Sequence, residues 1–410
     1  MDELSRLDID LSAVERNLAR LRQVIGPNCN LCPVVKADGY GLGARRIVPA
    51  MESAGAGMFA VYTPREAAEL LSPACRLPIL ILMPVRHVSP VDPLHEGIRT
   101  GQVHFVVHDA DHLDCLQELA IELDLLLHLH LKVDTGMHRG GCPAEAAPVL
   151  LDRIVDHRQL HLAGVCTHFS SSAGSDETTI RQRAVFDAVL DACIDRIDSD
   201  CLVHCANTAA VFRGQAFHRS MVRVGLGWAG ACPPGSVRNA SPDAKQLEPV
   251  VRWTSRVIQV REVEEGDRVG YDGLWKAQRN SVIGVVPVGY ADGYPPIPIN
   301  SHDGAPERVV GLLKQDQLLG YAPVIGTVSM DQVIVDLTDM LPLPGEGLGI
   351  GVELLSRSPD APNGLLGLSA SAGMKPHALL SCLHARIPRR YEGDVALVET
   401  LGPEERMAAG

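Results

Sequence analysis

Short apolar runs alternate with longer segments of helical periodicity from about residue 28 to about residue 230. Between the runs, apolar residues recur every three to four positions, as on the buried face of a helix. Eight strands, each followed by a helix, are typical of a closed (β/α)8 TIM-type barrel. A doubly wound sheet has the same alternation, but the number of units favours the barrel. The apolar runs fall at 30–37, 58–62, 77–84, 103–109, 125–136, 160–168, 201–207 and 221–227.

The pattern changes after about residue 245, where β-branched runs are separated by Gly, Pro and Asp turns. Such runs are typical of strands. We therefore expect an N-terminal α/β barrel over 1–240 and a C-terminal, mostly-β domain over 241–410. The polar stretch 235–246 is the expected linker. Residues 1–11 are a candidate strand that pairs with the β domain.

The charge balance argues against nucleic-acid and membrane partners. The 410 residues include 37 Lys and Arg against 50 Asp and Glu, a formal net charge of −13, and such a surface repels phosphate backbones and anionic lipid. The N-terminus has no apolar core of the signal-peptide kind. The densest apolar run, Leu77–Val85, is too short to span a bilayer. We therefore expect a cytoplasmic protein with a small-molecule substrate.

The eleven cysteines form no regular framework. Cys29 and Cys32 make one CxxC, and Cys201, His204 and Cys205 lie close together in the sequence. A zinc site would require a second CxxC or an HxxxH near these cysteines. We expect no metal site, and buried thiols in a reducing compartment.

Reactive residue types follow several of the predicted strands, and the C-terminal strand ends of a barrel form its active-site mouth. Lys36 follows the first run, and a desolvated lysine there is a nucleophilic amine suited to Schiff-base chemistry. Tyr40 lies in the Gly-rich loop that follows it. Thr208 and the backbone at Gly225 follow the seventh and eighth strands, the usual phosphate site of such barrels. Together with Arg223, these residues indicate pyridoxal 5′-phosphate (PLP) as the cofactor.

The motifs of this chain, taken together, resemble those of the alanine racemases. The resemblance covers the chain from about residue 5 to about residue 390. It implies a barrel followed by a β domain, in agreement with the periodicity. It also implies an isomerase that interconverts L- and D-alanine by two-base α-proton transfer on a PLP aldimine. The blocks, in the family's order, are VVKADGYGLG, KVDTGMHRGG, THFSSS, HCANTAA, RVGLG, GYDGLW, PVGYADGYP, GTVSMDQVIVDLTD and ARIPRR.

The resemblance implies two catalytic residues. Lys36 matches the lysine that holds PLP and acts as the base on one face of the substrate. Tyr271 matches the second base, which family dimers supply from the β domain of the partner subunit, so a homodimer with shared sites is implied. Racemisation removes a proton from one face and returns one to the other, which requires two such groups. Both have ordinary pKa values near about 10, so both need neighbours that lower them.

The resemblance also implies contacts with cofactor and substrate. Arg223 matches the arginine that faces the pyridine nitrogen, and because it retains its proton the nitrogen stays unprotonated, which suppresses transamination. His168 matches a histidine that is bonded to the second-base tyrosine, and Lys132 a lysine that is carbamylated in many members. The remaining cofactor contacts implied are Tyr40, Asn207, Thr208, Gly225 and Leu226. The substrate contacts implied are Arg139, Met330, Asp331 and Tyr290.

These residues also have purely structural interpretations. Their fixed order around Lys36 favours the catalytic one. The structural alternatives are sheet aromatics for Tyr271 and Tyr290, core packing for Met330, a loop ion pair of Arg139 with Asp134, and a satisfied core histidine for His168.

The sequence departs from the family pattern at several positions. His138 replaces a glycine and Gly140 a leucine. Ala385 stands where some members have a tyrosine near the PLP phosphate and the substrate side chain. The loss of a phenol predicts a roomier pocket, and hence a broader alanine/serine racemase as an alternative function. Two additional stretches, 301–310 and 311–321, are either surface hairpins or altered dimer contacts.

Other functions of the same scaffold are open. A PLP-dependent decarboxylase shares the two-domain plan, but the SMDQ and VGYADGYP blocks are similar to those of racemases. A non-catalytic PLP carrier resembles the barrel alone, whereas this chain has a second domain with Tyr271. A metal-dependent barrel hydrolase would need a His/Asp ligand set at the strand ends. The family's usual purpose is D-alanine biosynthesis for peptidoglycan.

Overall fold

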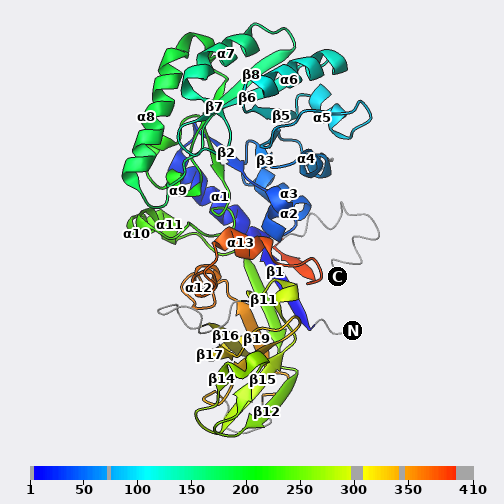
Figure 1. The fold of residues 1–410 in the computed structure, drawn as a ribbon, viewed down its shortest axis with the longest axis vertical. Helices are drawn as coiled ribbons and strands as arrows, with labels where there is room; N and C mark the ends of the chain where they lie inside the picture. The colour runs from blue at the N-terminus through cyan, green and yellow to red at the C-terminus, as the bar shows by residue number, and fades with distance from the viewer. Residues whose placement is uncertain (1–3, 72–74, 297–307, 341–346, 394–410) are drawn as a thin grey trace. The chain divides into compact units, whose positions relative to one another are not determined.

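A computed structural model describes residues 4–71, 75–296, 308–340 and 347–393 of the chain, which forms two units (Figure 1). The barrel unit comprises Val14–Trp228 and Cys232–Leu247. The β unit comprises the described residues of Met1–Ala13, Ala229–Ala231 and Glu248–Gly410.

Eight parallel strands form the sheet of the barrel unit. The two ends of the sheet meet, because Val34 pairs with Ala60 in a parallel bridge and the Val35 N–H donates to the Ala60 carbonyl at 2.9 Å. All eight predicted apolar runs contain strands, so the predicted (β/α)8 barrel is confirmed. The strand order is β2 (Asn30–Pro33), β10 (Met221–Val224), β9 (Leu202–His204), β8 (Leu160–Cys166), β6 (Leu127–Asp134), β5 (Val103–Val107), β4 (Ile79–Ile81) and β3 (Phe59–Val61), with β7 (Cys142–Pro143) paired to β6.

Helices connect successive strands and lie outside the sheet (Figure 1). Polar residues begin several of them, since Thr63, Asp109, Ser175 and Asn207 each accept a backbone N–H in the first turn of the following helix. The main helices are α1 (Leu11–Ile25), α3 (Ala44–Ser53), α4 (Pro64–Leu70), α5 (Leu94–Arg99), α6 (Ala110–Leu123), α7 (Ala147–Val155), α8 (Asp176–Ala192) and α9 (Thr208–Val211).

The predicted linker is not extended chain. Residues 235–246 form two short helices, α10 (Ser236–Ala240) and α11 (Pro242–Lys245), which belong to the barrel unit. Ser241 caps the second of them by accepting the Ala244 N–H, an interaction that its polar composition allowed but did not specify.

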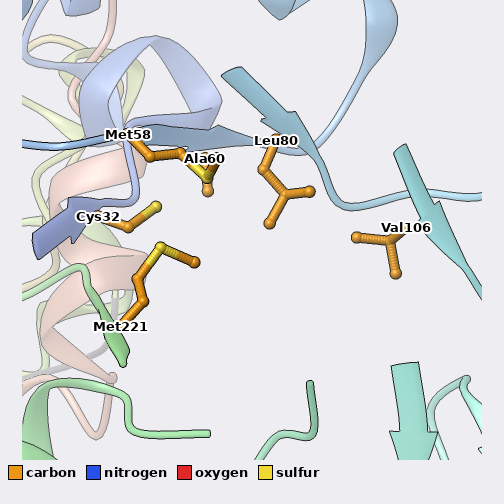
Figure 2. Close-up of a cluster of buried hydrophobic side chains, with 6 residues drawn as sticks. All are labelled: Cys32, Met58, Ala60, Leu80, Val106 and Met221. Atoms are coloured by element: carbon orange, nitrogen blue, oxygen red, sulfur yellow. The ribbon is translucent and has the colours of Figure 1, made fainter. Parts of the chain in front are cut away.

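Small and flexible side chains fill the interior of the barrel near β2 and β10. Figure 2 shows Cys32, Met58, Ala60, Leu80, Val106 and Met221 projecting into one buried cluster from neighbouring strands and the segment before β3. Unbranched Met and small Cys and Ala suit the irregular gaps that strand tilt creates.

All eleven cysteines are free, and nine of them are buried. Burial raises the pKa of Cys32 to about 12, so this thiol is unreactive. The prediction of buried thiols is therefore confirmed for most of them, whereas Cys115 is partly exposed and Cys382 is exposed. Within the described parts of the chain, no group of three or more His, Cys, Asp or Glu is arranged to hold a metal ion.

The β unit is built on a nine-stranded sheet, which confirms a mostly-β C-terminal part. The N-terminal strand β1 (Ser5–Asp10) pairs antiparallel with β11 (Val251–Arg256) and parallel with β20 (Arg389–Glu392). The order is β12 (Gln259–Val263), β15 (Ser281–Val286), β18 (Val333–Asp336), β17 (Gln317–Ile325), β16 (Val309–Lys314), β19 (Gly351–Leu355), β11, β1 and β20. The unit also has the hairpin β13 (Arg268–Val269) and β14 (Trp275–Lys276), and helices α12 (Leu365–Ser371) and α13 (Pro376–Ser381).

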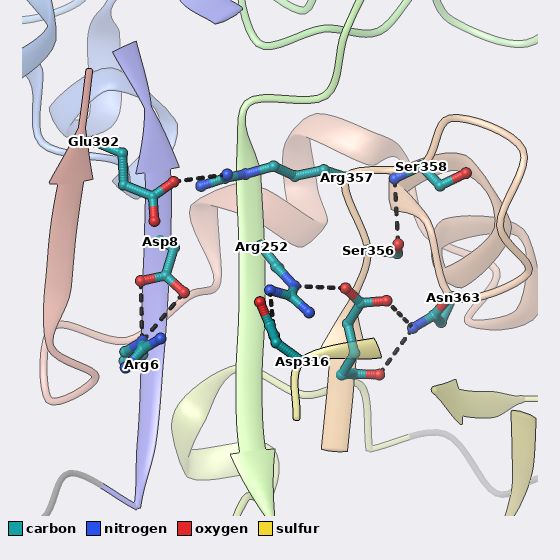
Figure 3. A network of polar contacts seen from close by, with 10 residues as sticks. Arg6, Asp8, Arg252, Asp316, Ser356, Arg357, Ser358, Asn363 and Glu392 are labelled. Carbon is teal, nitrogen blue, oxygen red and sulfur yellow. Dashed lines mark hydrogen bonds and ion pairs between the residues drawn. The ribbon is translucent and has the colours of Figure 1, made fainter. Parts of the chain in front are cut away.

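Ion pairs connect the strands of this sheet (Figure 3). Arg252 on β11 contacts Glu353 on β19 at 2.6 Å and Asp316 in the β16–β17 turn at 2.8 Å. Asn363 donates to the Glu353 carbonyl at 2.8 Å. Because Arg252 and Glu353 are largely buried, each depends on the other for compensation of its charge.

The additional stretch 311–321 belongs to the β16–β17 hairpin of this sheet. Of the other stretch, 301–310, residues 301–307 lie outside the described residues. Among the described residues, no helix is long and apolar enough to cross a membrane.

Candidate active site

Lys36 lies three residues after the end of β2 and begins a left-handed turn, α2, which ends at residue 41. The four residues after Lys36 have φ between 52° and 61°, which costs roughly 1–2 kcal/mol for each one that carries a side chain. Side chains hold this backbone in place: the Ala37 N–H donates to Glu66 Oε1 at 2.7 Å, and the Ala44 N–H donates to Asp38 Oδ1 at 2.8 Å. Strain that is maintained in this way is typical of functional sites.

The Lys36 amine lies in a positively charged, half-buried environment. Burial lowers the pKa of Lys36, the charge of Arg139 lowers it further, and the Glu66 carboxylate offsets part of this effect. Its Nζ lies 5.9 Å from the centroid of the Tyr62 ring. A lowered pKa increases the fraction of neutral, nucleophilic amine.

Tyr40, Thr208 and Gly225 form a cradle of uncharged donors. Tyr40 stacks on Trp228 with ring centroids 5.6 Å apart, and burial raises the pKa of its phenol to about 12, so the phenol keeps its proton. A Cβ at Gly225 would lie 2.1 Å from Tyr40 Oη, so only glycine permits this approach. Thr208 Oγ1 accepts the N–H of Gly225 at 3.2 Å and of Gly227 at 3.1 Å. Such donors suit a phosphate group.

Asn207 orders the loop before α9. Its Oδ1 accepts the Ser172 hydroxyl at 2.7 Å and the Ala210 N–H at 3.2 Å. Leu226, also implied as a phosphate contact, is buried, and its backbone N–H and carbonyl are its only polar groups.

Arg223, near the C-terminal end of β10, is buried and bonded through both terminal nitrogens. Nη1 donates to the His204 carbonyl at 3.0 Å and to His204 Nδ1. Nη2 donates to the Thr167 carbonyl at 2.7 Å and faces His168 Nδ1 at 3.4 Å. Burial and the nearby charge of Arg223 hold the pKa of His168 well below its usual value. His168 is therefore neutral and accepts through Nδ1.

The loop after β6 carries Arg139. Asp134 Oδ1 accepts the N–H groups of residues 136 and 137 at 2.9 Å and of His138 at 3.1 Å. The side chain of His138 is 85% exposed and pairs with Asp134 Oδ2 at 3.2 Å. Asp134 thus holds the loop by accepting its backbone N–H groups and by pairing with His138, rather than through an ion pair with Arg139. Burial lowers the pKa of Lys132 on β6, and Arg139 and Arg223 lower it further.

The other four implied residues form a separate, exposed group in the β unit. Tyr271 is 69% and Met330 54% exposed, and Met330 therefore does not fill the core. The Tyr290 N–H donates to the Ser329 carbonyl at 3.1 Å. Arg386 donates to Asp331 at 2.9 Å. The structure thus assembles two sets of residues, one in each unit.

Sequence reasoning missed two features of the barrel set. Glu66 supports the turn that carries Lys36, and a chain of buried histidines contacts Arg223. The TPRE motif indicates a capped helix at Thr63, but its second use at Ala37 arises only in the fold. The alternating LHLHL run over 127–131 places His128 and His130 on one face of β6, and the sequence alone does not show what that face contacts.

Family models match nearly the whole chain. The model described as "Alanine racemase, N-terminal domain" matches residues 9–233, and "Alanine racemase, C-terminal domain" matches residues 250–391. An alanine racemase of Desulfovibrio desulfuricans is 31% identical over 386 residues, which cover 94% of this chain and 97% of that protein.

Solved structures are similar over the same extent. The alanine racemase from D-cycloserine-producing Streptomyces lavendulae superposes with a TM-score of 0.82 at 25% identity, covering 96% of this chain and 98% of that one. The alanine racemase of Bartonella henselae, solved with covalently bound pyridoxal phosphate, gives a TM-score of 0.77 at 26% identity, covering 95% of this chain and all of that one.

Proposed function

This chain belongs to the alanine racemase family, and from that membership we propose that Lys36 and Tyr271 are the two acid–base groups with which it interconverts L- and D-alanine. It is an isomerase, and its cofactor is PLP. The barrel is proposed as the cofactor-binding part and the β unit as the source of the second base. The observation that supports the assignment most directly is the half-buried Lys36, which is held on a strained turn beside Arg139.

The residues of the barrel fit PLP. The close approach of Tyr40 Oη to Gly225, together with the N–H groups that now bond Thr208, makes a cradle suited to the phosphate. Lys36 would provide the amine that binds the aldehyde, and Arg223 would provide a permanent donor for the pyridine nitrogen. When bound, PLP stabilises the negative charge that develops at the α-carbon of the amino acid.

The chain's own residues then control where protons go. We propose that the Lys36 amine accepts and returns the α-proton on one face of the substrate, and the Tyr271 phenol on the other. Arg139 is exposed at the end of its loop and is proposed to bind the substrate carboxylate, together with Met330 and Asp331. Arg223 cannot release its proton, so it does not protonate the ring.

The exposed set in the β unit is proposed to complete the site of a second copy. Tyr271, Tyr290 and Met330 are all substantially exposed in a single chain, as expected of residues that a partner covers. A homodimer with shared sites follows from this proposal. Lys132 is proposed to carry a carbamate, which would balance the positive charges that now lower its pKa.

The cellular role is proposed by the same reasoning. Eleven free thiols fit a reducing compartment such as the cytoplasm. There the enzyme would supply D-alanine for peptidoglycan.

Proton exchange in D2O tests the assignment. With PLP and L-alanine, the wild-type protein should exchange the α-proton, measured by NMR, while optical rotation decays to zero. Tyr271→Phe should keep exchange of one enantiomer without inversion, because one of two bases remains. An unchanged racemisation rate in this variant would exclude Tyr271 as a base. Exchange with CO2 release would indicate a decarboxylase, and a bound chromophore without exchange a carrier.

A further inference from the structure

A chain of three buried histidines runs through the barrel to Arg223. His104 Nδ1 lies 2.9 Å from His130 Nε2, and His130 Nδ1 lies 2.8 Å from His204 Nε2. His204 Nδ1 contacts Nη1 of Arg223. All three imidazoles are buried, with His130 and His204 0% exposed. The chain therefore connects the beginning of β5 to the end of β10 across β6 and β9.

The arginine fixes the direction of every hydrogen bond in this chain. A guanidinium has only donors, so His204 Nδ1 must accept and its proton must be on Nε2. That proton is donated to His130 Nδ1, which places the proton of His130 on Nε2. The His130 Nε2–H is in turn donated to His104 Nδ1, so the proton of His104 is also on Nε2. A backbone hydrogen bond to Gly101 is available to this residue. All three rings thus have the same neutral tautomer.

An additional proton on any of these rings would disrupt the chain. An imidazolium has two N–H donors, and one of them would then face the donor of its neighbour. The titratable side chains that stack next to the three histidines are also basic. The ring centroids of His128 and His104 are 4.8 Å apart, and those of His161 and His128 are 5.0 Å apart. Burial and these neighbours lower the pKa values of His104 and His130. The three histidines are therefore neutral, and they accept hydrogen bonds in series from the buried Arg223 cation.

We propose that His104 and His130 are positioning residues that hold, through His204, the Arg223 guanidinium toward the pyridine nitrogen of PLP. The inference rests on the role of Arg223 proposed above. Within the described residues, the bonds to His204, Thr167 and His168 account for the four Nη hydrogens of Arg223. The Nε–H is thus the donor left for a ligand. Orientation of the guanidinium plane decides where this donor points.

The three histidines stabilise Arg223 without placing an anion beside it. A carboxylate partner would neutralise part of the charge of Arg223, whereas a polarised imidazole accepts strongly and remains neutral, because each ring that donates onward becomes a better acceptor. Loss of the acceptor at His104 would leave the His130 Nε2–H buried and unpaired, which is costly. If all three rings took the opposite tautomer, the Nδ1–H of His204 would face the Nη1–H of Arg223, and two donors would oppose each other there.

Three variants test the proposal in the PLP-loaded enzyme. His104→Phe keeps the ring volume but removes the acceptor. His104→Asn restores an acceptor, because Oδ1 occupies the position of Nδ1. His128→Phe is the matched control, since it keeps the ring that stacks on His104 and leaves the chain intact. The readouts are the absorption spectrum of bound PLP and the pyridoxamine phosphate formed per racemisation event, as alanine is oxidised to pyruvate and the cofactor is reduced.

We expect His104→Phe to shift the absorption spectrum and to raise pyridoxamine phosphate formation about tenfold, in line with one unpaired buried donor. His104→Asn should return both values to within about twofold of wild type, and His128→Phe should change neither. A variant His104→Phe that folds with wild-type spectrum and partitioning would overturn the proposal, because it would show a structural role alone.

Neutron crystallography of the wild-type, PLP-loaded protein tests the same proposal without a variant. Deuterium should be found on Nε2, and not on Nδ1, of His104, His130 and His204. Deuterium on Nδ1 of His130 or His204 would overturn the inference. This readout is independent of turnover, so failure of the racemase assignment and failure of the histidine chain are distinguished.

Discussion

Gly140 illustrates, at the scale of one residue, how the site accommodates a neighbour that the sequence does not reveal. Its φ is +124°, and a Cβ would lie 2.9 Å from His108 Nδ1 and 3.7 Å from Lys132 Nζ. His108 Nε2 bonds the Leu82 carbonyl at 3.0 Å, so the ring cannot move away freely. The space that His108 occupies therefore explains why residue 140 is a glycine and not the family's usual leucine.

We predict that Gly140→Ala lowers the free energy of unfolding by roughly 1–3 kcal/mol, through backbone strain and the clash with His108. Urea titration measures the change. Gly174→Ala is the matched control, because no atom lies within 4 Å of its Cβ position and its φ is not positive. Equal stability of the two variants would contradict the structural reading of Gly140.

We propose that Ala385 determines how large a substrate side chain the site accepts. It is exposed in the single chain and adjoins Arg386, which bonds Asp331. Ala385→Tyr should lower kcat/KM for L-serine about tenfold relative to L-alanine, because a phenol there fills space that a larger side chain needs. Steady-state kinetics with both substrates measure this ratio. An unchanged ratio would show that residue 385 does not determine specificity.

At the scale of elements, α4 supports the turn that carries Lys36. Glu66 accepts the N–H of Ala37 at 2.7 Å, of Tyr62 at 2.8 Å and of Thr63 at 3.0 Å. One carboxylate thus caps a helix and fixes a strained turn. Glu69, on the same helix, forms only an exposed pair with Arg65 among the described contacts.

Glu66→Ala should therefore destabilise the protein by roughly 2 kcal/mol and weaken PLP binding, since three backbone donors lose a charged acceptor. Glu69→Ala should change stability by less than about 0.5 kcal/mol. Thermal unfolding and a PLP titration monitored by absorbance measure the two effects. Similar losses in both variants would exclude a special role for Glu66.

Buried histidines on the barrel strands, and in the loops that follow them, predict that the protein loses stability in acid. Burial lowers the pKa of His104 to about 3 and of His108 to about 4, against about 6.5 in the unfolded chain. The unfolded state therefore binds more protons between these values. The free energy of unfolding should fall as pH decreases from about 6.5 to about 4, by up to about 1.4 kcal/mol per pH unit for each such histidine.

Urea titrations at about pH 7, 6 and 5 measure this slope. His104→Asn should reduce the uptake of protons on unfolding by about one, whereas His87→Asn, a change at an exposed histidine, should keep the wild-type slope. Identical slopes for wild type and His104→Asn would be inconsistent with a buried neutral His104.

The elements also show what the sequence predicts and what it does not. Strands buried on both faces read as continuous apolar runs, so all eight barrel strands were predictable. Residues after the strands, such as Lys36 and Thr208, were predictable as neighbours because the C-terminal ends of barrel strands meet at one mouth. The left-handed turn was not, because it depends on Glu66, 29 residues away. The histidine chain was not either, since polar residues alternating along a strand usually indicate a solvent-exposed face.

At the scale of the whole molecule, the two implied bases belong to different units. Lys36 is part of the barrel unit and Tyr271 of the β unit. Tyr271 forms part of a short 3-10 turn, and its carbonyl accepts the Thr327 hydroxyl at 3.5 Å. Its ring is largely exposed. We propose that a second copy brings its Tyr271 phenol to each Lys36.

Complementation between two inactive variants tests this central claim most directly. Lys36→Ala and Tyr271→Phe are co-expressed with different affinity tags, and the mixed dimer is isolated by tandem purification. If each site combines Lys36 of one copy with Tyr271 of the other, one of the two sites is intact and the mixed dimer should show about half of the wild-type racemase activity. Activity no higher than that of the two parent variants would contradict the account.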